Sequence, residues 1–315
     1  METGHDIPST VTVNSQPQES KPVAKLMSWT STPVTWLYLV VCTVIYLGLI
    51  VANDYESPET LAKFGYVGAD RIWGGAWWAL VTSTVVHFDL WHFAFNVYWL
   101  WVLGRVLEST IGSWRYLALL TSGAAISSSY QLAVSDTTGI GASGMIYAIF
   151  GYMAITRQRY PEFQSVLPWS VIKLFNSWLV LCLVVTYLNI MSVGNAAHFA
   201  GLLFGAGIGW IVLREVYWRA AALGIVTLAF GAFVPLFWMP WSIHWHRYRA
   251  YRLHTDGQYE AAVGHYDEVI ERAPEDSWAY QSRSGAFQSL NKPIQAREDM
   301  KRALELDPSL NAERN

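Results

Sequence analysis

Four polar side chains lie in otherwise apolar stretches, and their types are those of a hydrolytic site. They are His92, Asn96, Ser143 and His198. Polar and ionisable groups are costly inside a bilayer, so residues of this kind suggest function. A serine hydroxyl becomes a useful nucleophile when a base accepts its proton, and His198 is the available base. The only nearby carboxylates, Asp89 and Glu108, flank one apolar stretch at opposite ends. The pattern therefore predicts a two-residue dyad.

The same residues also offer donors for a developing negative charge. The oxygen of a tetrahedral intermediate needs positioned hydrogen-bond donors. His92 and Asn96 are four residues apart and so share one helix face; with the backbone N–H of Ser143 they form a candidate oxyanion site. Each residue alone has an ordinary interpretation, because a lone serine or histidine in a membrane helix usually has a packing role.

Helical spacing predicts which faces meet. Ser143, Tyr147 and Gly151 form one stripe, while His198 shares a stripe with Gly201, Gly205 and Gly209. A stripe of glycines lets two helix backbones approach closely. We therefore expect the helix that carries His198 to pack against the helix that carries Ser143.

The composition predicts a membrane protein with a water-soluble C-terminal end. Of 315 residues, 53% are hydrophobic and 14% charged, whereas an average soluble domain is about 25% charged. A span needs about 20 mostly apolar residues. Seven segments qualify, the fourth of them short: Val34–Val51, Trp91–Leu107, Tyr116–Val134, Gly141–Ile155, Leu174–Ile190, Ala196–Leu213 and Ala220–Trp238. The net charge of −3 gives no sign of nucleic-acid binding, and no metal or cofactor is implied.

The short loops predict the orientation. Lysine and arginine, which favour the cytoplasmic side, occur before span one and after spans two, four and six, whereas Ser135–Ile140 and Met191–Asn195 hold none. The N-terminus is thus expected inside. Spans two, four and six then run inwards, and the four candidate residues, all near the starts of these spans, share one depth in the outer part of the membrane.

The regions around the spans have their own signatures. Residues 1–30 are polar and rich in Ser, Thr, Pro and Gln, as is typical of a disordered tail. Ala52–Leu90 reads as an interfacial loop, since Gly74-Gly75 excludes a long continuous helix. Span seven allows two interpretations: a crossing, which the lack of charge favours and which puts the C-terminal region outside, or a re-entrant helix, which would keep that region in the cytoplasm.

The C-terminal region repeats itself. An offset of 34 residues pairs Gly257 with Asn291, Ala262 with Ala296, Ile270 with Leu304 and Pro274 with Pro308. This is the period of tetratricopeptide (TPR) repeats, in which antiparallel helices pack through small residues. Two repeats are fewer than the three usually needed for independent stability, so we expect support from the membrane domain, a capping helix or a partner. An ordinary helical hairpin is the alternative.

Several strings resemble the motif set of rhomboid proteases, in the same order and spacing. These strings are His92-Phe-Ala-Phe-Asn96, Gly141-Ala-Ser143-Gly144 with Tyr147, and Ala197-His198-Phe-Ala-Gly201 with Gly205. The resemblance covers roughly Val34–Leu213. It implies an all-α, polytopic membrane bundle, a six-helix rhomboid core plus a seventh C-terminal span, followed by a TPR-like repeat domain. The expected divisions are 1–30 (tail), 31–215 (catalytic core), 216–241 (seventh helix) and 247–315 (repeats).

The resemblance also implies roles. Ser143 would be the nucleophile and His198 the base; His92, Asn96 and the Ser143 amide would be oxyanion donors. Supporting residues would be Tyr147, stacked on or orienting His198, and Gly141, Gly144, Gly201 and Gly205. His87 would belong to the interfacial first loop, in which the family's frequent Trp-Arg is replaced by Trp78-Ala79.

The expected function is that of an intramembrane serine endopeptidase in a prokaryotic cell membrane. Its expected partners are substrates with a transmembrane segment, the lipid bilayer and a protein that the repeats bind. A catalytically inactive rhomboid-like scaffold is the alternative. Such a protein would be expected to lack Ser143 or His198, and both residues are present.

Overall fold

The computed structural model describes residues 30–52, 54, 57–214 and 216–310, which form helices and no strand. In the first half these are α1 (Pro33–Val51), α2 (Pro58–Lys63), α3 (Ala69–Trp73), α4 (Ala79–Thr82), η2 (Ser83–Val85), α5 (Leu90–Trp99), the π-helical turn η3 (Leu100–Gly104), α6 (Arg105–Ile111), α7 (Ser113–Ser135) and α8 (Ser143–Thr156). The others are α9 (Glu162–Val166), α10 (Trp169–Tyr187), α11 (Asn195–Leu213), α12 (Trp218–Phe237), α13 (Ile243–Thr255), α14 (Tyr259–Arg272), α15 (Ser277–Ser289) and α16 (Pro293–Leu306). The expected tail, but for its last residue, lies outside the described residues.

Several helices are long and apolar enough to cross a membrane. Within the described ranges they are α1, α7, α10, α11 and α12, of 19 to 23 residues each. α8 is a shorter apolar helix, and α5, η3 and α6 follow one another without a break. Each of the seven segments expected to span overlaps one of these helices or, for Trp91–Leu107, the run from α5 to α6. The expectation of an all-helical fold with several membrane-capable helices is confirmed.

A buried carboxylate joins the start of α1 to α6 and α7. Glu108 accepts hydrogen bonds from the backbone N–H groups of Val34 (2.9 Å) and Thr35 (2.8 Å) and from the hydroxyls of Thr35 and Ser113. The first N–H groups of a helix have no partner within the helix. Glu108 supplies the missing acceptor for two of these N–H groups. The carboxylate at the end of predicted span two therefore has a structural role at the start of α1.

α8 lies at the centre of the bundle and packs closely on α11. Nearly all its side chains are buried. A Cβ atom added to Gly201 would lie 2.0 Å from the carbonyl oxygen of Gly144, and one added to Gly205 would lie 1.9 Å from that of Ala148. Only glycine permits this approach, as the stripe predicted.

The segment between α1 and α5 is a series of short helices, not a span. α3 ends at Trp73 with Gly74 as its C-cap, and Gly75 has φ +107°, which favours glycine. The indole Nε1 of Trp73 donates to the carbonyl oxygen of Pro235 near the end of α12 (3.0 Å). The predicted interfacial loop therefore contacts the last apolar helix.

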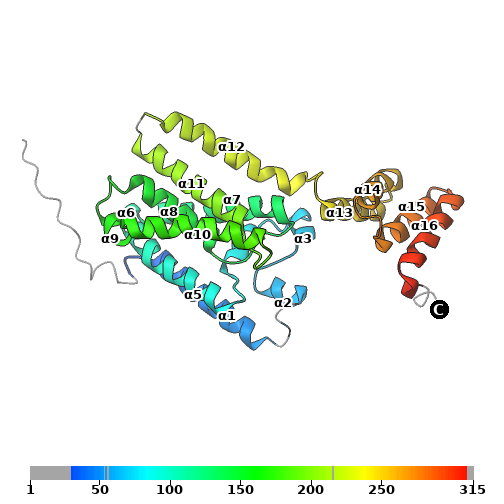
Figure 1. Cartoon of the computed structure of the whole chain (residues 1–315), viewed down its shortest axis with the longest axis horizontal. Coiled ribbons are helices and arrows are strands. Elements are labelled where there is room, and N and C mark those ends of the chain that lie inside the picture. Colours follow the sequence, from blue (N-terminus) through cyan, green and yellow to red (C-terminus); the bar gives the residue numbers. More distant parts are fainter. Residues whose placement is uncertain (1–29, 53, 55–56, 215, 311–315) are drawn as a thin grey trace, which may run out of the picture.

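α12 runs back beside α11 and leads into the C-terminal helices, which project beyond the end of the bundle that carries α3 (Figure 1). Its end is fastened to α7: Ser129 Oγ donates to the carbonyl oxygen of Ala232 (2.5 Å), and Trp241 Nε1 donates to that of Ala133 (2.8 Å). The C-terminal helices thus begin at the end of α7 that leads to Ser143.

The last four helices form two pairs with the predicted offset. α13 and α15 begin at Ile243 and Ser277, 34 residues apart, and α14 and α16 begin at Tyr259 and Pro293, again 34 apart. Gly257 and Asn291, which the alignment paired, both have a left-handed backbone, with φ of 74° and 59°. The first pair begins at Ile243, earlier than the expected residue 247.

Candidate active site

Ser143 and His198 are brought together by the packing of α8 on α11. Ser143 is the first residue of α8, and His198 lies in the first turn of α11. His198 Nε2 and Ser143 Oγ are 2.8 Å apart, within hydrogen-bond distance. His198 is 4% exposed, so the pair is shielded from bulk water on the histidine side. This geometry is suitable for proton transfer from the hydroxyl to the ring.

Tyr147 holds the ring of His198 from the side. It lies one turn after Ser143, and its ring centroid is 4.8 Å from that of His198 with a tilt of 35°. Its hydroxyl donates to the carbonyl oxygen of Phe175 on α10 (3.1 Å). His198 Nδ1 is buried and has no hydrogen-bond partner among the described residues. The arrangement therefore has two members, and Tyr147 contributes a ring contact rather than a hydrogen bond.

His92 and Asn96 lie against the loop that leads to Ser143. A Cβ atom added to Gly141 would meet His92 Nε2 at 2.6 Å and Asn96 Nδ2 at 3.3 Å. Asn96 is 2% exposed, and its Nδ2 donates to the carbonyl oxygen of His92 (2.9 Å). An amide nitrogen carries two hydrogens, so a second donor is left. Both side chains thus line the approach to Ser143, on the face that their spacing predicted.

His87 is a buried member of this region whose contacts the sequence did not predict. Its Nδ1 lies 3.2 Å from the carbonyl oxygen of Val85, an arrangement that requires a hydrogen on Nδ1. Its Nε2 then accepts the N–H of Ala142 at 3.4 Å. The ring also lies edge-on to that of His92, with centroids 5.2 Å apart. His87 therefore supports both the oxyanion side and the residue before Ser143.

Gln131 of α7 is a second residue that was missed. Its Oε1 accepts the backbone N–H of Ala197 (3.2 Å), next to His198, and its Nε2 donates to Ser135 Oγ (2.9 Å). A polar residue within an apolar span was the only signal in the sequence. Gln131 connects the start of α11 with the last residue of α7.

Part of the chain is similar to known proteins. Residues 74–215 match the family model of the rhomboid domain. Similar proteins include the rhomboid protease GlpG of Yersinia pseudotuberculosis serotype I (strain IP32953) and that of Yersinia pestis (strain Pestoides F), each 32% identical over 175 residues, which is 55% of this chain. The chain spans 60% of the length of these relatives. The residues of the candidate site lie within the rhomboid match, and α12 to α16 lie after it.

Proposed function

We propose that the chain is a rhomboid-type intramembrane serine endopeptidase that hydrolyses peptide bonds in or beside the transmembrane segments of other membrane proteins. The observation that carries this proposal is the 2.8 Å contact between Ser143 Oγ and His198 Nε2 within apolar helices. The rhomboid-domain match and the relatives called rhomboid protease GlpG support the same class of reaction.

The proposed reaction uses the dyad twice. Ser143 Oγ attacks the carbonyl carbon of the scissile bond while its proton passes to His198 Nε2. The negative oxygen of the tetrahedral intermediate is assigned to the Ser143 N–H, the Asn96 amide and the His92 ring. When the carbon–nitrogen bond breaks, His198 gives its proton to the leaving amine. Water, deprotonated by the same ring, then hydrolyses the acyl-enzyme and restores Ser143.

A substrate helix has to approach Ser143 from within the bilayer. The side between α5 and α10 is a candidate route. There the two helices meet through the rings of Phe95 and Trp178, whose centroids are 5.2 Å apart, and a substrate would have to separate these rings. Both rings are about two-fifths exposed. The bound segment must also unwind, so we expect residues with low helix propensity, such as glycine or proline, near the cut.

We also propose a placement in the membrane. Seven crossings with a cytoplasmic N-terminus would put Ser143 in the outer half of a prokaryotic cell membrane and α13 to α16 outside, on the side where the site opens. The contacts of α12 with α7 and with Trp73 support a full crossing. The paired helices would serve as a TPR-like unit that binds a protein.

The test is cleavage of a single-span model substrate by the purified protein in liposomes. Ser143→Ala and His198→Ala should each abolish cleavage, and the double variant should be no worse than either single variant, because the two groups act as a unit. Ser109→Ala is a matched control, since among the described residues its hydroxyl bonds only to Val106 of its own helix. Cleavage that persists in Ser143→Ala would overturn the mechanism, and an inactive wild type that stays folded would favour a scaffold.

A further inference from the structure

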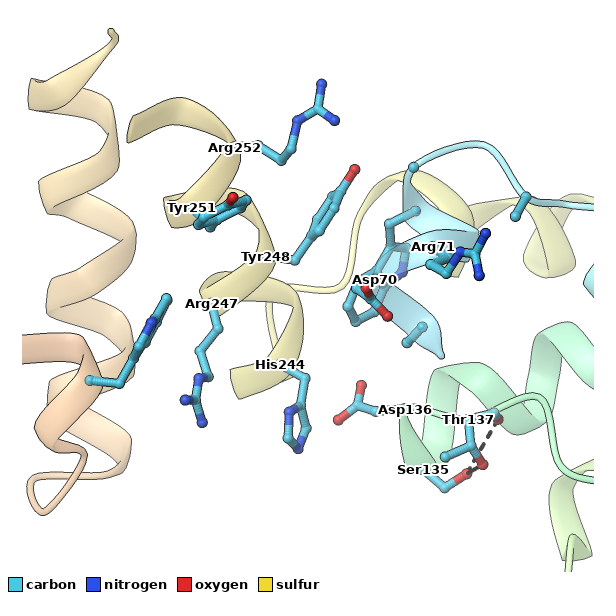
Figure 2. A pocket seen from close by; sticks show the side chains of 15 residues that line it. Asp70, Arg71, Ser135, Asp136, Thr137, His244, Arg247, Tyr248, Tyr251 and Arg252 are labelled. Carbon is cyan, nitrogen blue, oxygen red and sulfur yellow. Dashed lines mark hydrogen bonds between the residues drawn. The ribbon is translucent and has the colours of Figure 1, made fainter. Parts of the chain in front are cut away.

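A cleft lies between the C-terminal helices and the end of the membrane bundle. It has a volume of about 900 Å³ and is bounded by α13, by α3 and by the loop from Ser135 to Thr137 (Figure 2). Tyr248 of α13 reaches α3 across it, with its ring centroid 5.6 Å from that of Trp73, and Figure 2 shows His244 beside Asp136. The cleft separates the C-terminal helices from the membrane bundle. The rhomboid match ends at residue 215 and so does not cover the wall that α13 forms.

The cleft continues into a second hollow of about 470 Å³, and the two share Asp136, His244 and Arg247. Trp241 and Asp276 line the far part. The two hollows therefore adjoin at these three residues. Two adjoining hollows suit an extended chain better than a compact group.

The charges that line the space have both signs, and two of the arginines form no ion pair with a described residue. Arg247 pairs with Asp276 (3.3 Å) and lies over the ring of Trp278. Arg71 and Arg252, by contrast, make no ion pair within the described chain. Asp136 Oδ1 is buried without a hydrogen-bond partner among the described residues. The two arginines are available to a ligand that offers carboxylate or carbonyl oxygens.

Such a lining is suited to a polypeptide and poorly suited to an anionic lipid headgroup. The carboxylates of Asp70 and Asp136 would repel a phosphate, whereas a peptide offers N–H groups to the carboxylates and carbonyl or carboxylate oxygens to the arginines. Tyr248, Tyr251 and Trp278 add flat rings, which bind protein segments at a low cost in side-chain entropy.

One wall of the cleft leads directly to the candidate active site. Ser135 to Thr137 form this wall at the end of α7, and the loop continues through Gly141 to Ser143, the first residue of α8. The amide nitrogen of Gln131 donates a hydrogen bond to Ser135, and its amide oxygen accepts one from the N–H of Ala197, beside His198. A segment bound in the cleft would therefore be positioned by the same elements as the dyad.

We propose that this cleft binds the exposed part of the substrate, an extended polar segment with acidic and basic side chains that flanks the transmembrane helix. The proposal rests on the proposed protease function and adds a second recognition site to it. The segment would raise the local concentration of the transmembrane helix near Ser143. Loss of the contact between this segment and the cleft would weaken substrate binding more than it would slow the chemical step.

Two substrates and one pair of variants test this kinetically. The substrates share one transmembrane helix and carry a mixed-charge exposed segment of about 30 or about 5 residues. At about 3.3 Å per residue the extended segments reach about 100 Å and about 17 Å, so the longer one has far more chain to occupy the cleft. In phosphatidylcholine liposomes, Tyr251→Ala/Arg252→Glu should raise the KM of the long substrate relative to the short one by about tenfold, the scale of losing interface anchors. Arg297→Glu, an exposed arginine of α16 outside the cleft, is the matched control.

A second measurement does not depend on cleavage. A photo-crosslinking amino acid in place of Tyr251, in the Ser143→Ala protein, should capture the exposed segment of the long substrate, and the same group in place of Arg297 should not. An unchanged KM ratio or an absent crosslink at position 251 would overturn the proposal. A KM change for both substrates that appears only when phosphatidylglycerol is added would assign the cleft to lipid and also overturn it. Failure of the wild type to cleave would count against the protease alone, because the crosslink is read in the inactive variant.

Discussion

At the residue scale, the site depends on how one imidazole is held. If the Ser143 hydroxyl donates to His198 Nε2, the hydrogen of the neutral ring is on Nδ1, which has no acceptor among the described residues. The orientation of the ring must then come from packing, and Tyr147 supplies it through the ring contact. The side chain of Tyr147 is itself fixed by its hydrogen bond to Phe175 on α10.

The proposed oxyanion donors give a prediction at this scale. Asn96→Ala removes the amide beside Gly141, and removal of one such donor typically lowers kcat by about 10²–10³-fold. We expect kcat to fall within roughly that range while KM changes little, since the donor acts on the charge of the intermediate. Steady-state kinetics with the model substrate measure both. An Asn96→Ala protein with wild-type kcat would remove this residue from the site.

At the element scale, the contact between α8 and α11 decides where the dyad lies. The Cβ of Gly205→Ala would lie 1.9 Å from the carbonyl oxygen of Ala148, so the helices would have to separate. Overpacking of this kind costs about 1–3 kcal/mol, and it would move His198, two turns away, from Ser143. We expect a lower thermal unfolding temperature and at least a tenfold loss of kcat.

Gly224→Ala on α12 is the matched control for that substitution. Its added Cβ would meet no atom within 4 Å. Alanine has a higher helix propensity than glycine, so this variant should be as stable as the wild type or slightly more stable. Equal losses in Gly205→Ala and Gly224→Ala would show that close packing at Gly205 is not what maintains the site.

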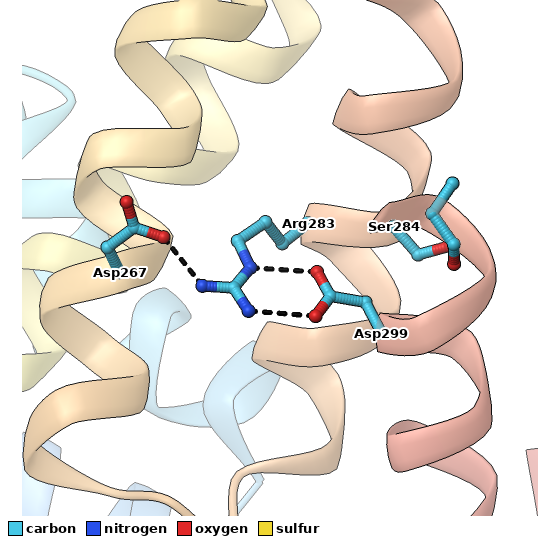
Figure 3. A network of polar contacts seen from close by, with 5 residues as sticks. Asp267, Arg283, Ser284 and Asp299 are labelled. Carbon is cyan, nitrogen blue, oxygen red and sulfur yellow. Dashed lines mark hydrogen bonds and ion pairs between the residues drawn. The ribbon is translucent and has the colours of Figure 1, made fainter. Parts of the chain in front are cut away.

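The paired C-terminal helices depend on a partly buried arginine. Arg283 of α15 makes two parallel hydrogen bonds of 2.8 Å to Asp299 of α16 and a third, of 2.6 Å, to Asp267 of α14 (Figure 3). The hydrogen bonds that Asp299 accepts are the largest cause that raises the pKa of the Arg283 guanidinium, so Arg283 stays ionised. The side chains of Arg283 and Asp299 are 17% and 9% exposed.

Loss of Arg283 should therefore loosen α15 and α16 in particular. Arg283→Ala leaves Asp299 buried without its partner, and breaking a buried pair costs about 3–5 kcal/mol; we expect the lower end because Arg283 also reaches the surface. Faster hydrogen exchange of the α15 and α16 amides in the full-length protein would report this loss. Arg283→Met/Asp299→Leu should restore much of the protection, and Arg297→Ala should change little.

At the scale of the whole molecule, α12 determines on which side of the membrane the paired helices lie. It has 20 residues with a mean hydropathy of 2.1, and at 1.5 Å per residue it is about 30 Å long, the thickness of the hydrocarbon core. Topology reporters fused after Arg219 and after Asn315 should therefore report opposite sides. If both report the cytoplasm, α12 does not cross, and the cleft has no access to an outward-facing substrate segment.

The sequence by itself determined those expectations for which chemistry and short-range periodicity carry the information. The types and spacing of His92, Asn96, Ser143 and His198 predicted one site, because residues three or four apart share a helix face and polar groups are rare in apolar spans. The 34-residue offset predicted the paired helices through small residues and positions such as Gly257, where a helix pair turns.

Only the tertiary structure decided which distant residues support that site. Glu108 binds Val34, His87 accepts from Ala142, and Gln131 holds Ala197, contacts that join residues 55 to 74 positions apart. Such partners depend on how whole helices pack, which periodicity along one helix does not specify. The cleft beside α13 has the same origin: its walls come from α3, the loop after α7 and the first C-terminal pair, and they become neighbours only because α12 returns the chain to that end of the bundle.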